Sequence, residues 1–246
     1  MPDFREELYR RYVSTLKGGQ APTPDAALQS YWASCERWFL PFLDGLDRAA
    51  PILELGCGPG HMMEFLRSHG FANVQGIDVS EEQVRVAAGR GLDAQAADAF
   101  DFLPPRQGVF DAIVAIDFIE HFTREELLRL FPLILGALKP GGTLLLQTPN
   151  GRGLFPNDVI YGDLTHMTIF TTDSLAQLLR LAGFEGFEFR ETAPVARSFR
   201  GRIRVVLWRL VRRCANFLRT IEAGKRQDIW TENFICCCRK PEPRRE

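Results

Sequence analysis

The sequence predicts an α/β fold, an open and mostly parallel sheet with helices on both faces. Seven short apolar runs have the length and composition of strands, at 51–55, 73–78, 93–97, 109–116, 142–148, 185–191 and 232–238. Helical patterns lie between most of them, at 60–69, 81–90, 123–138 and 172–183. Strands that alternate with helices in this way are typical of parallel sheets with crossover helices.

Helix ends support this order of elements. Ser80 precedes two glutamates, Thr123 and Glu126 have the spacing of a capping box, and Gly183 is placed to end a helix. The chain has 246 residues, of which 46% are hydrophobic and 25% charged. This is enough to bury the core of one enzyme-sized domain with a small lid or insertion.

Charge and cysteine usage exclude several classes of function. The net charge of −1 gives no reason to expect a nucleic-acid partner. The six cysteines contain no C-x-x-C pair, so no metal is expected. The chain opens with no signal-peptide pattern and contains no run of 18 apolar residues. We therefore expect a cytoplasmic protein.

The first strand ends in the turn that bears most directly on function. Residues 52–60 read ILELGCGPG, an apolar run that ends in three glycines at alternate positions. Such a turn lets backbone bend sharply and approach a ligand closely. A dinucleotide site would need G-x-G-x-x-G, but His61 stands where its third glycine belongs. Asp78 ends the next strand, 22 residues after Gly56.

With these features the sequence resembles the class I S-adenosylmethionine-dependent methyltransferases, closest to the sugar or polysaccharide and the ubiquinone-type O-methyltransferases. ADA at 97–99, FDAIVAIDFIEH at 110–121 and LKPGGTLLLQTPN at 138–150 follow in the order of that family, and the resemblance covers roughly residues 50–190. It implies a Rossmann-like seven-stranded sheet with S-adenosyl-L-methionine as cofactor. The implied cofactor-binding residues are Glu54, Gly56, Cys57, Gly58, Gly60, Asp78, Val79, Asp98, Ala99, Ile116 and Asp117.

Methyl transfer to a hydroxyl also needs a base, because a neutral alcohol is a poor nucleophile. His166 lies in a segment that resembles the H-x-x-x-F-(S/T) loop of sugar-modifying methyltransferases, so it is the first candidate, with Asp163 to orient it. His121 follows the fourth strand and is the alternative. The residues expected to contact the acceptor are Tyr31, Asn150, Tyr161, His166 and Phe170.

The chain extends beyond the expected core on both sides. We expect an N-terminal helical cover (1–48), a cofactor-binding core (49–191), a helical insertion (192–231) and a last strand with a tail (232–246). Within the insertion, apolar residues recur at three- and four-residue steps from Ile203 to Ile221 and arginines occupy the other face. Three interpretations stay open for segment 199–221: packing on the domain or in a homodimer, peripheral binding to an anionic membrane at its inner face, or a groove for an anionic substrate.

The residues together predict an O-methyltransferase that acts on a sugar hydroxyl of a surface glycan or polysaccharide precursor. One alternative acceptor is a small aromatic or quinone-type metabolite. Another alternative is a scaffold or regulatory protein that binds S-adenosylmethionine without catalysis.

Overall fold

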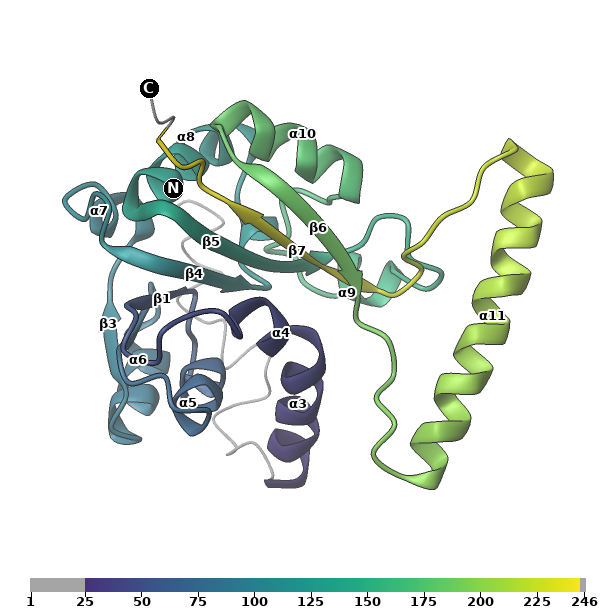
Figure 1. Cartoon of the computed structure of the whole chain (residues 1–246), viewed down its shortest axis with the longest axis horizontal. Coiled ribbons are helices and arrows are strands. Elements are labelled where there is room, and N and C mark those ends of the chain that lie inside the picture. The colour runs from purple at the N-terminus through teal and green to yellow at the C-terminus, as the bar shows by residue number, and fades with distance from the viewer. Residues whose placement is uncertain (1–24, 244–246) are drawn as a thin grey trace.

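A computed structural model describes residues 25–243 of the chain, so the part of the expected N-terminal cover before residue 25 lies outside the described residues. Strands and helices alternate along most of this range (Figure 1). The strands are β1 (Ile52–Leu55), β2 (Val74–Asp78), β3 (Asp93–Ala96), β4 (Phe110–Ile116), β5 (Leu138–Pro149), β6 (Glu185–Glu191) and β7 (Asn233–Arg239). The helices are α3 (Asp25–Trp38), α4 (Leu40–Leu43), α5 (His61–Ser68), α6 (Glu81–Gly89), α7 (Ala99–Phe102), α8 (Arg124–Ala137), α9 (Asn157–Tyr161), α10 (Thr172–Ala182) and α11 (Phe199–Ala223), with a 3₁₀ turn η1 at Ile119–His121.

The strands form a single seven-stranded sheet in the order β3-β2-β1-β4-β5-β7-β6. The first five strands along the chain are parallel, and β7 runs antiparallel between β5 and β6. The predicted fold class is therefore confirmed. The strand order reverses between β1 and β4, and such a reversal leaves a crevice at the carboxyl ends of the two strands.

Both faces of the sheet are covered because side chains of the central strands alternate between two cores. Leu53 of β1 and Ile113 of β4 belong to the core beneath α8 and α10. Ile52 and Val114, one residue away on the same strands, pack in the second core against Phe65 of α5. A strand that is buried on both faces reads as a continuous apolar run, which is why these strands could be predicted.

The expected helix caps are present. The Ser80 hydroxyl accepts a hydrogen bond from the backbone N–H of Gln83, and Thr123 and Glu126 cap each other. Gly183 ends α10 in the left-handed conformation. These local signals fix where the helices begin and end, and hence which residues reach the carboxyl edge of the sheet.

Several elements differ from the expectation or add to it. The strand expected at 142–148 begins at Leu138, because Leu138 pairs with Phe110 before a shift in register. The short helices α7 and α9 and the turn η1 were not expected. The basic helix α11 has 25 residues and stands at the edge of the molecule, apart from the sheet (Figure 1). None of the helices among residues 25–243 has the length and apolar character needed to cross a membrane.

Candidate active site

A cavity of about 1320 Å³ opens at the carboxyl ends of β1, β2 and β4. It is larger than the roughly 300–1,000 Å³ common for one small ligand, so it has room for two molecules side by side. Of the eleven residues expected to bind cofactor, ten line this cavity. They are Glu54, Gly56, Cys57, Gly58, Asp78, Val79, Asp98, Ala99, Ile116 and Asp117.

Asp78 holds the glycine turn in place. Its Oδ2 accepts a hydrogen bond from the Gly58 N–H at 2.9 Å, and its Oδ1 accepts one from the Ser80 N–H at 2.8 Å. Gly58 has φ +52°, and a Cβ built on it would meet no atom within 4 Å. The backbone at Gly58 therefore borders open space, where a ligand can approach it closely.

Gly60 is the one expected cofactor residue that does not line the cavity. It precedes α5 with φ +83°, and a Cβ on it would collide with Leu92 and lie 3.2 Å from the Ala87 Cβ. The expectation is corrected: Gly60 is needed for the close packing of the turn against α6.

Glu54 is the penultimate residue of β1, and its carboxyl group is buried beneath the turn. Its Oε2 has no hydrogen-bond partner among the described residues. Burial raises the pKa of Glu54 well above its usual value, and the charge of Asp78 raises it further. Tyr31 of α3 lies close enough to Glu54 for the two to interact electrostatically, so the described part of the N-terminal cover closes the cavity on this side.

Asp98 and Asp117 follow β3 and β4, two strands that are separated in the sheet by β2 and β1. Asp98 caps α7, with its Oδ1 accepting from the Phe100 N–H at 2.8 Å. Asp117 has φ +49° and is the sole non-glycine residue with positive φ among residues 25–243. Gln147 donates to its Oδ1 at 3.0 Å, a contact that sequence reasoning missed. Strained backbone of this kind costs about 1–3 kcal/mol and is concentrated at functional sites.

His121 is held by a relay of two further side chains. Thr165 Oγ1 lies 2.6 Å from Asp163 Oδ1 and 2.8 Å from His121 Nδ1. An ionised carboxylate can only accept, so Thr165 donates to Asp163 and His121 Nδ1–H donates to Thr165. Burial, together with the neighbouring His166, lowers the pKa of His121 from 6.5 to about 4. His121 is therefore neutral at neutral pH, with its Nε2 as the lone-pair nitrogen.

His166 lines the same cavity and lies beside His121, with 4.9 Å between the ring centroids. Its Nε2 is 4.0 Å from Asp163 Oδ2. Its Nδ1 is buried and has no hydrogen-bond partner among the described residues. The three expected catalytic residues are thus brought together, and the second nitrogen of His166 is left for a ligand.

Glu120 is a site residue that sequence reasoning missed. It is fully buried, its Oε2 accepts from the Thr148 hydroxyl at 3.0 Å, and its Oε1 has no partner. Burial raises the pKa of Glu120 well above its usual value, and Asp117 raises it further. The signal in the sequence was an acid directly before His121, in the turn that follows the fourth strand.

Glu120, His121 and His166 also form a potential metal-binding group. Their ligand atoms lie within 4.8 Å of one another. The expectation of no metal rested on the spacing of cysteines and did not consider this cluster.

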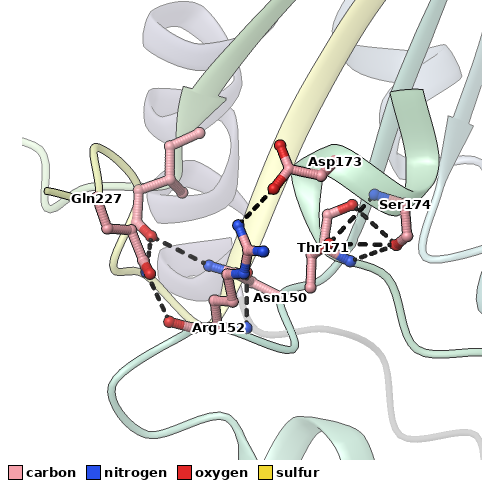
Figure 2. A network of polar contacts seen from close by, with 7 residues as sticks. Asn150, Arg152, Thr171, Asp173, Ser174 and Gln227 are labelled. Carbon is pink, nitrogen blue, oxygen red and sulfur yellow. Dashed lines mark hydrogen bonds and ion pairs between the residues drawn. The ribbon is translucent and has the colours of Figure 1, made fainter. Parts of the chain in front are cut away.

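Asn150 does not face the cavity, which corrects its expected role at the acceptor. Its side-chain amide donates to the carbonyl of Thr231 at 2.9 Å. Its Oδ1 accepts a hydrogen bond from the Arg152 N–H (Figure 2). Arg152 in turn contacts Asp173 of α10, and Gln227 donates to the Arg152 carbonyl (Figure 2). Asn150 therefore ties the end of β5 to the segment that leads into β7.

Two further acceptor residues are corrected. Phe170 is buried in the core and pairs with Asn150 in an isolated bridge, so it packs the fold and does not reach the cavity. Tyr161 ends α9 with 78% of its surface exposed and lies outside the main cavity. Tyr31 and His166 do line the cavity.

Comparisons with known proteins agree with this geometry. Residues 27–188 match a family described as "Methyltransferase domain". Trans-aconitate 2-methyltransferase of Mycobacterium tuberculosis is 36% identical over 107 residues, which cover 43% of this chain and 39% of that protein. Ubiquinone biosynthesis O-methyltransferase of Xanthomonas campestris is 34% identical over 107 residues, covering 41% and 44%.

The chain thus spans less than half the length of these two relatives. A solved SAM-dependent methyltransferase from Archaeoglobus fulgidus has the same fold, with a TM-score of 0.67 and 18% identity over 97% of this chain and 100% of that one. The family match covers more than half of the chain and includes the turn at Gly58 and Asp78. The chain belongs to the class I S-adenosylmethionine-dependent methyltransferases.

Proposed function

We propose that the chain transfers a methyl group from S-adenosylmethionine to a neutral hydroxyl, that of a sugar in a glycan or polysaccharide precursor. The observation that carries this proposal is the placement of His166, which lines the same cavity as Asp78 and the glycine turn and whose buried Nδ1 has no hydrogen-bond partner among the described residues.

The residues present fit the cofactor. The open space above Gly58 accommodates a molecule that lies against backbone. The unpartnered Oε2 of Glu54 suits the ammonium of the amino-acid part, and the carboxylate of Asp78 suits the ribose hydroxyls. Asp98 would accept from the adenine amino group. When bound, S-adenosylmethionine supplies a methyl group on a positively charged sulfur.

The charge of the cavity favours a neutral acceptor over a multiply anionic one. Among the described residues, its lining has one cationic side chain, Arg85, against nine acids. The acids are Glu54, Asp78, Glu81, Glu82, Asp98, Asp117, Glu120, Glu126 and Asp163. Burial raises the pKa of Glu54 and Glu120, but the other seven acids still outnumber Arg85, so the lining attracts a cationic cofactor and repels a polycarboxylate. The name of the mycobacterial relative, trans-aconitate 2-methyltransferase, therefore carries less weight for the acceptor of this chain.

In this proposal His166 removes the proton of the attacking hydroxyl. Its Nδ1 receives the proton, and Asp163, 4.0 Å from Nε2, stabilises the resulting imidazolium. Asp163 is itself positioned by the Thr165 N–H at 2.8 Å and by the Thr165 hydroxyl. His121, neutral and tied to Thr165, orients this pair and is not the first base because its lowered pKa makes it a weak one.

A phenolic or quinone-type hydroxyl is the second candidate acceptor. Phe100, Phe118 and Phe122 line the cavity as an edge-to-face cluster, with ring centroids 4.9 Å apart for Phe118 and Phe122. Such a cluster suits an aromatic ring. The similarity to a ubiquinone biosynthesis O-methyltransferase points in the same direction.

The test is a transfer assay with S-adenosylmethionine labelled in its methyl group. The acceptor panel contains oligosaccharides, catechols, a primary amine and trans-aconitate. We expect label in a sugar or phenolic hydroxyl, and we expect His166→Gln to lower kcat about 10²–10⁴-fold while the affinity for S-adenosylhomocysteine stays at the parent value.

Full turnover of His166→Gln would show that His166 is not the base. Transfer to the amine or to trans-aconitate alone would refute a hydroxyl acceptor. Cofactor binding without transfer to any acceptor would favour a non-catalytic scaffold.

A further inference from the structure

The helix α11 carries two opposite faces, one directed at the domain and one at solvent. Partly or fully shielded residues recur along it at Val205, Trp208, Arg212, Ala215 and Arg219, at three- and four-residue steps. Steps of this size define one side of a helix. Along this side Arg212 reaches Glu191 at the end of β6 at 2.5 Å and the carbonyl of Asp228 at 2.9 Å.

The other side of α11 is apolar and exposed. Ile203, Leu207, Leu210, Cys214, Phe217 and Ile221 recur at three- and four-residue steps and are all exposed. Between 43% and 68% of the surface of the five large apolar residues is accessible. Of the interpretations left open for this stripe, packing on the domain is therefore wrong, because the domain meets the opposite side. The helix stands outward from the sheet at the edge of the molecule (Figure 1).

The charge of the segment is equally one-sided. Residues 199–226 contain nine lysines and arginines and a single acid, Glu222, although the whole chain has a net charge of −1. Arg209, Arg212, Arg213 and Arg226 line a groove of about 510 Å³, and Phe217 of the apolar stripe lies at the same groove. A groove lined by arginines thus directly borders the exposed apolar stripe.

We propose that α11 docks the protein on the surface of an anionic phospholipid membrane, with the apolar stripe among the acyl chains and lipid phosphates in the arginine groove. A helix of 25 residues is about 38 Å long and would lie in the plane of the interface. Arginine binds phosphate through two parallel hydrogen bonds, which a lysine cannot do.

A second copy of the chain is a poorer occupant of the same stripe. Pairing two α11 helices around a two-fold axis would bring their arginine rows together, and like charges at an interface oppose association. An anionic lipid surface has the complementary charge. The membrane proposal is independent of the identity of the methyl acceptor.

The experiment is flotation of the full chain with vesicles of phosphatidylcholine alone or mixed with phosphatidylglycerol. We expect the protein to float with the mixed vesicles, to stay behind with phosphatidylcholine alone, and to be released by salt, since surface electrostatics are screened.

Two variants and two controls locate the contact. Leu210→Glu removes part of the stripe, and Arg209→Glu with Arg213→Glu reverses charge in the groove; each should reduce partitioning at least about tenfold. Leu181→Glu on α10 and Arg124→Glu on α8 change exposed residues of the same types elsewhere and should leave flotation unchanged. Unchanged binding of S-adenosylhomocysteine shows that each variant is folded.

Two results would overturn the proposal. The first is that the parent protein does not float with the mixed vesicles, or that all four variants float as the parent does. The second is a parent protein that fails to float and is dimeric by light scattering, together with a Leu210→Glu variant that is monomeric. That result would assign the stripe to a second copy of the chain.

Discussion

Two glycines of the same turn should respond differently to substitution, because one borders the cavity and the other packs against the domain. Gly58 and Gly60 both have positive φ, +52° and +83°. Alanine in this conformation costs about 1–2 kcal/mol, so the backbone cost is similar at both positions. What differs is the space that a Cβ would enter.

The magnitudes follow from these surroundings. The Gly58 Cβ would meet nothing within 4 Å, so Gly58→Ala should lower the free energy of unfolding only by the cost of the backbone conformation, about 1–2 kcal/mol. The Gly60 Cβ would collide with Leu92 and press on Ala87. Overpacking of this kind adds about 1–3 kcal/mol, so Gly60→Ala should cost about 2–5 kcal/mol. Each kcal/mol lowers Tm by about 2–4 °C, so we expect Tm to fall by roughly 2–8 °C in Gly58→Ala and by roughly 4–20 °C in Gly60→Ala.

Cofactor affinity should show the reverse order. The new methyl of Gly58→Ala enters the space proposed for the cofactor, and a steric cost of about 1–3 kcal/mol lowers affinity by about 5- to 150-fold. Gly60→Ala leaves that space unchanged, so its affinity should stay close to the parent value.

Calorimetric unfolding and isothermal titration with S-adenosylhomocysteine measure the two quantities. Gly224→Ala, at φ +63° with no atom within 4 Å of its Cβ and beyond the end of α11, is the control for the backbone cost. If Gly60→Ala weakens binding more than Gly58→Ala, or if Gly58→Ala binds as the parent does, the assignment of the two glycines is wrong.

Two further predictions concern the histidine cluster. The folded-state pKa of His121, about 4, lies below its unfolded value of 6.5, so its contribution to stability is present above pH 6.5 and is lost as pH falls to about 4. At 1.36 kcal/mol per pKa unit this contribution is about 3 kcal/mol. In denaturant unfolding, the free energy of unfolding of His121→Gln should therefore fall over this pH range by about 3 kcal/mol less than that of the parent. A pH dependence parallel to that of the parent would contradict the lowered pKa. Treatment with a chelator followed by gel filtration should leave methyl transfer unchanged, because the role proposed for His166 needs no metal. Loss of activity that Mg²⁺ or Mn²⁺ restores would instead show that Glu120, His121 and His166 hold a cation.

The fold, and most of the residues that line the cavity at the glycine turn, could be predicted because their signals are local. The central strands are buried on both faces and read as apolar runs, and the helices carry their own caps. The turn at Gly58 and the acid at Asp78 follow strands directly, so the fold brings them together at the edge where parallel strands end.

Residues whose roles depend on distant partners could not be predicted in this way. Thr165 gains its role from His121, 44 residues away, and Glu120 gains its partner from Thr148 on β5. Asn150 and Phe170 sit in segments that resemble acceptor-contacting ones, but hydrogen bonds and burial direct them into the fold. Sequence spacing does not fix these directions.

The sequence by itself determined the order of strands and helices, the family, and the acids that follow the carboxyl ends of the strands. Each of these is indicated by residues close together in the sequence, namely apolar periodicity, helix caps and glycine turns. The amphipathic character of residues 203–221 was also evident from the sequence. Only the tertiary structure decided that the apolar stripe of α11 faces solvent, because Arg212 and Ala215 on the opposite side meet the domain. Which face of a helix is covered depends on how its connections place it, and no local pattern records that placement.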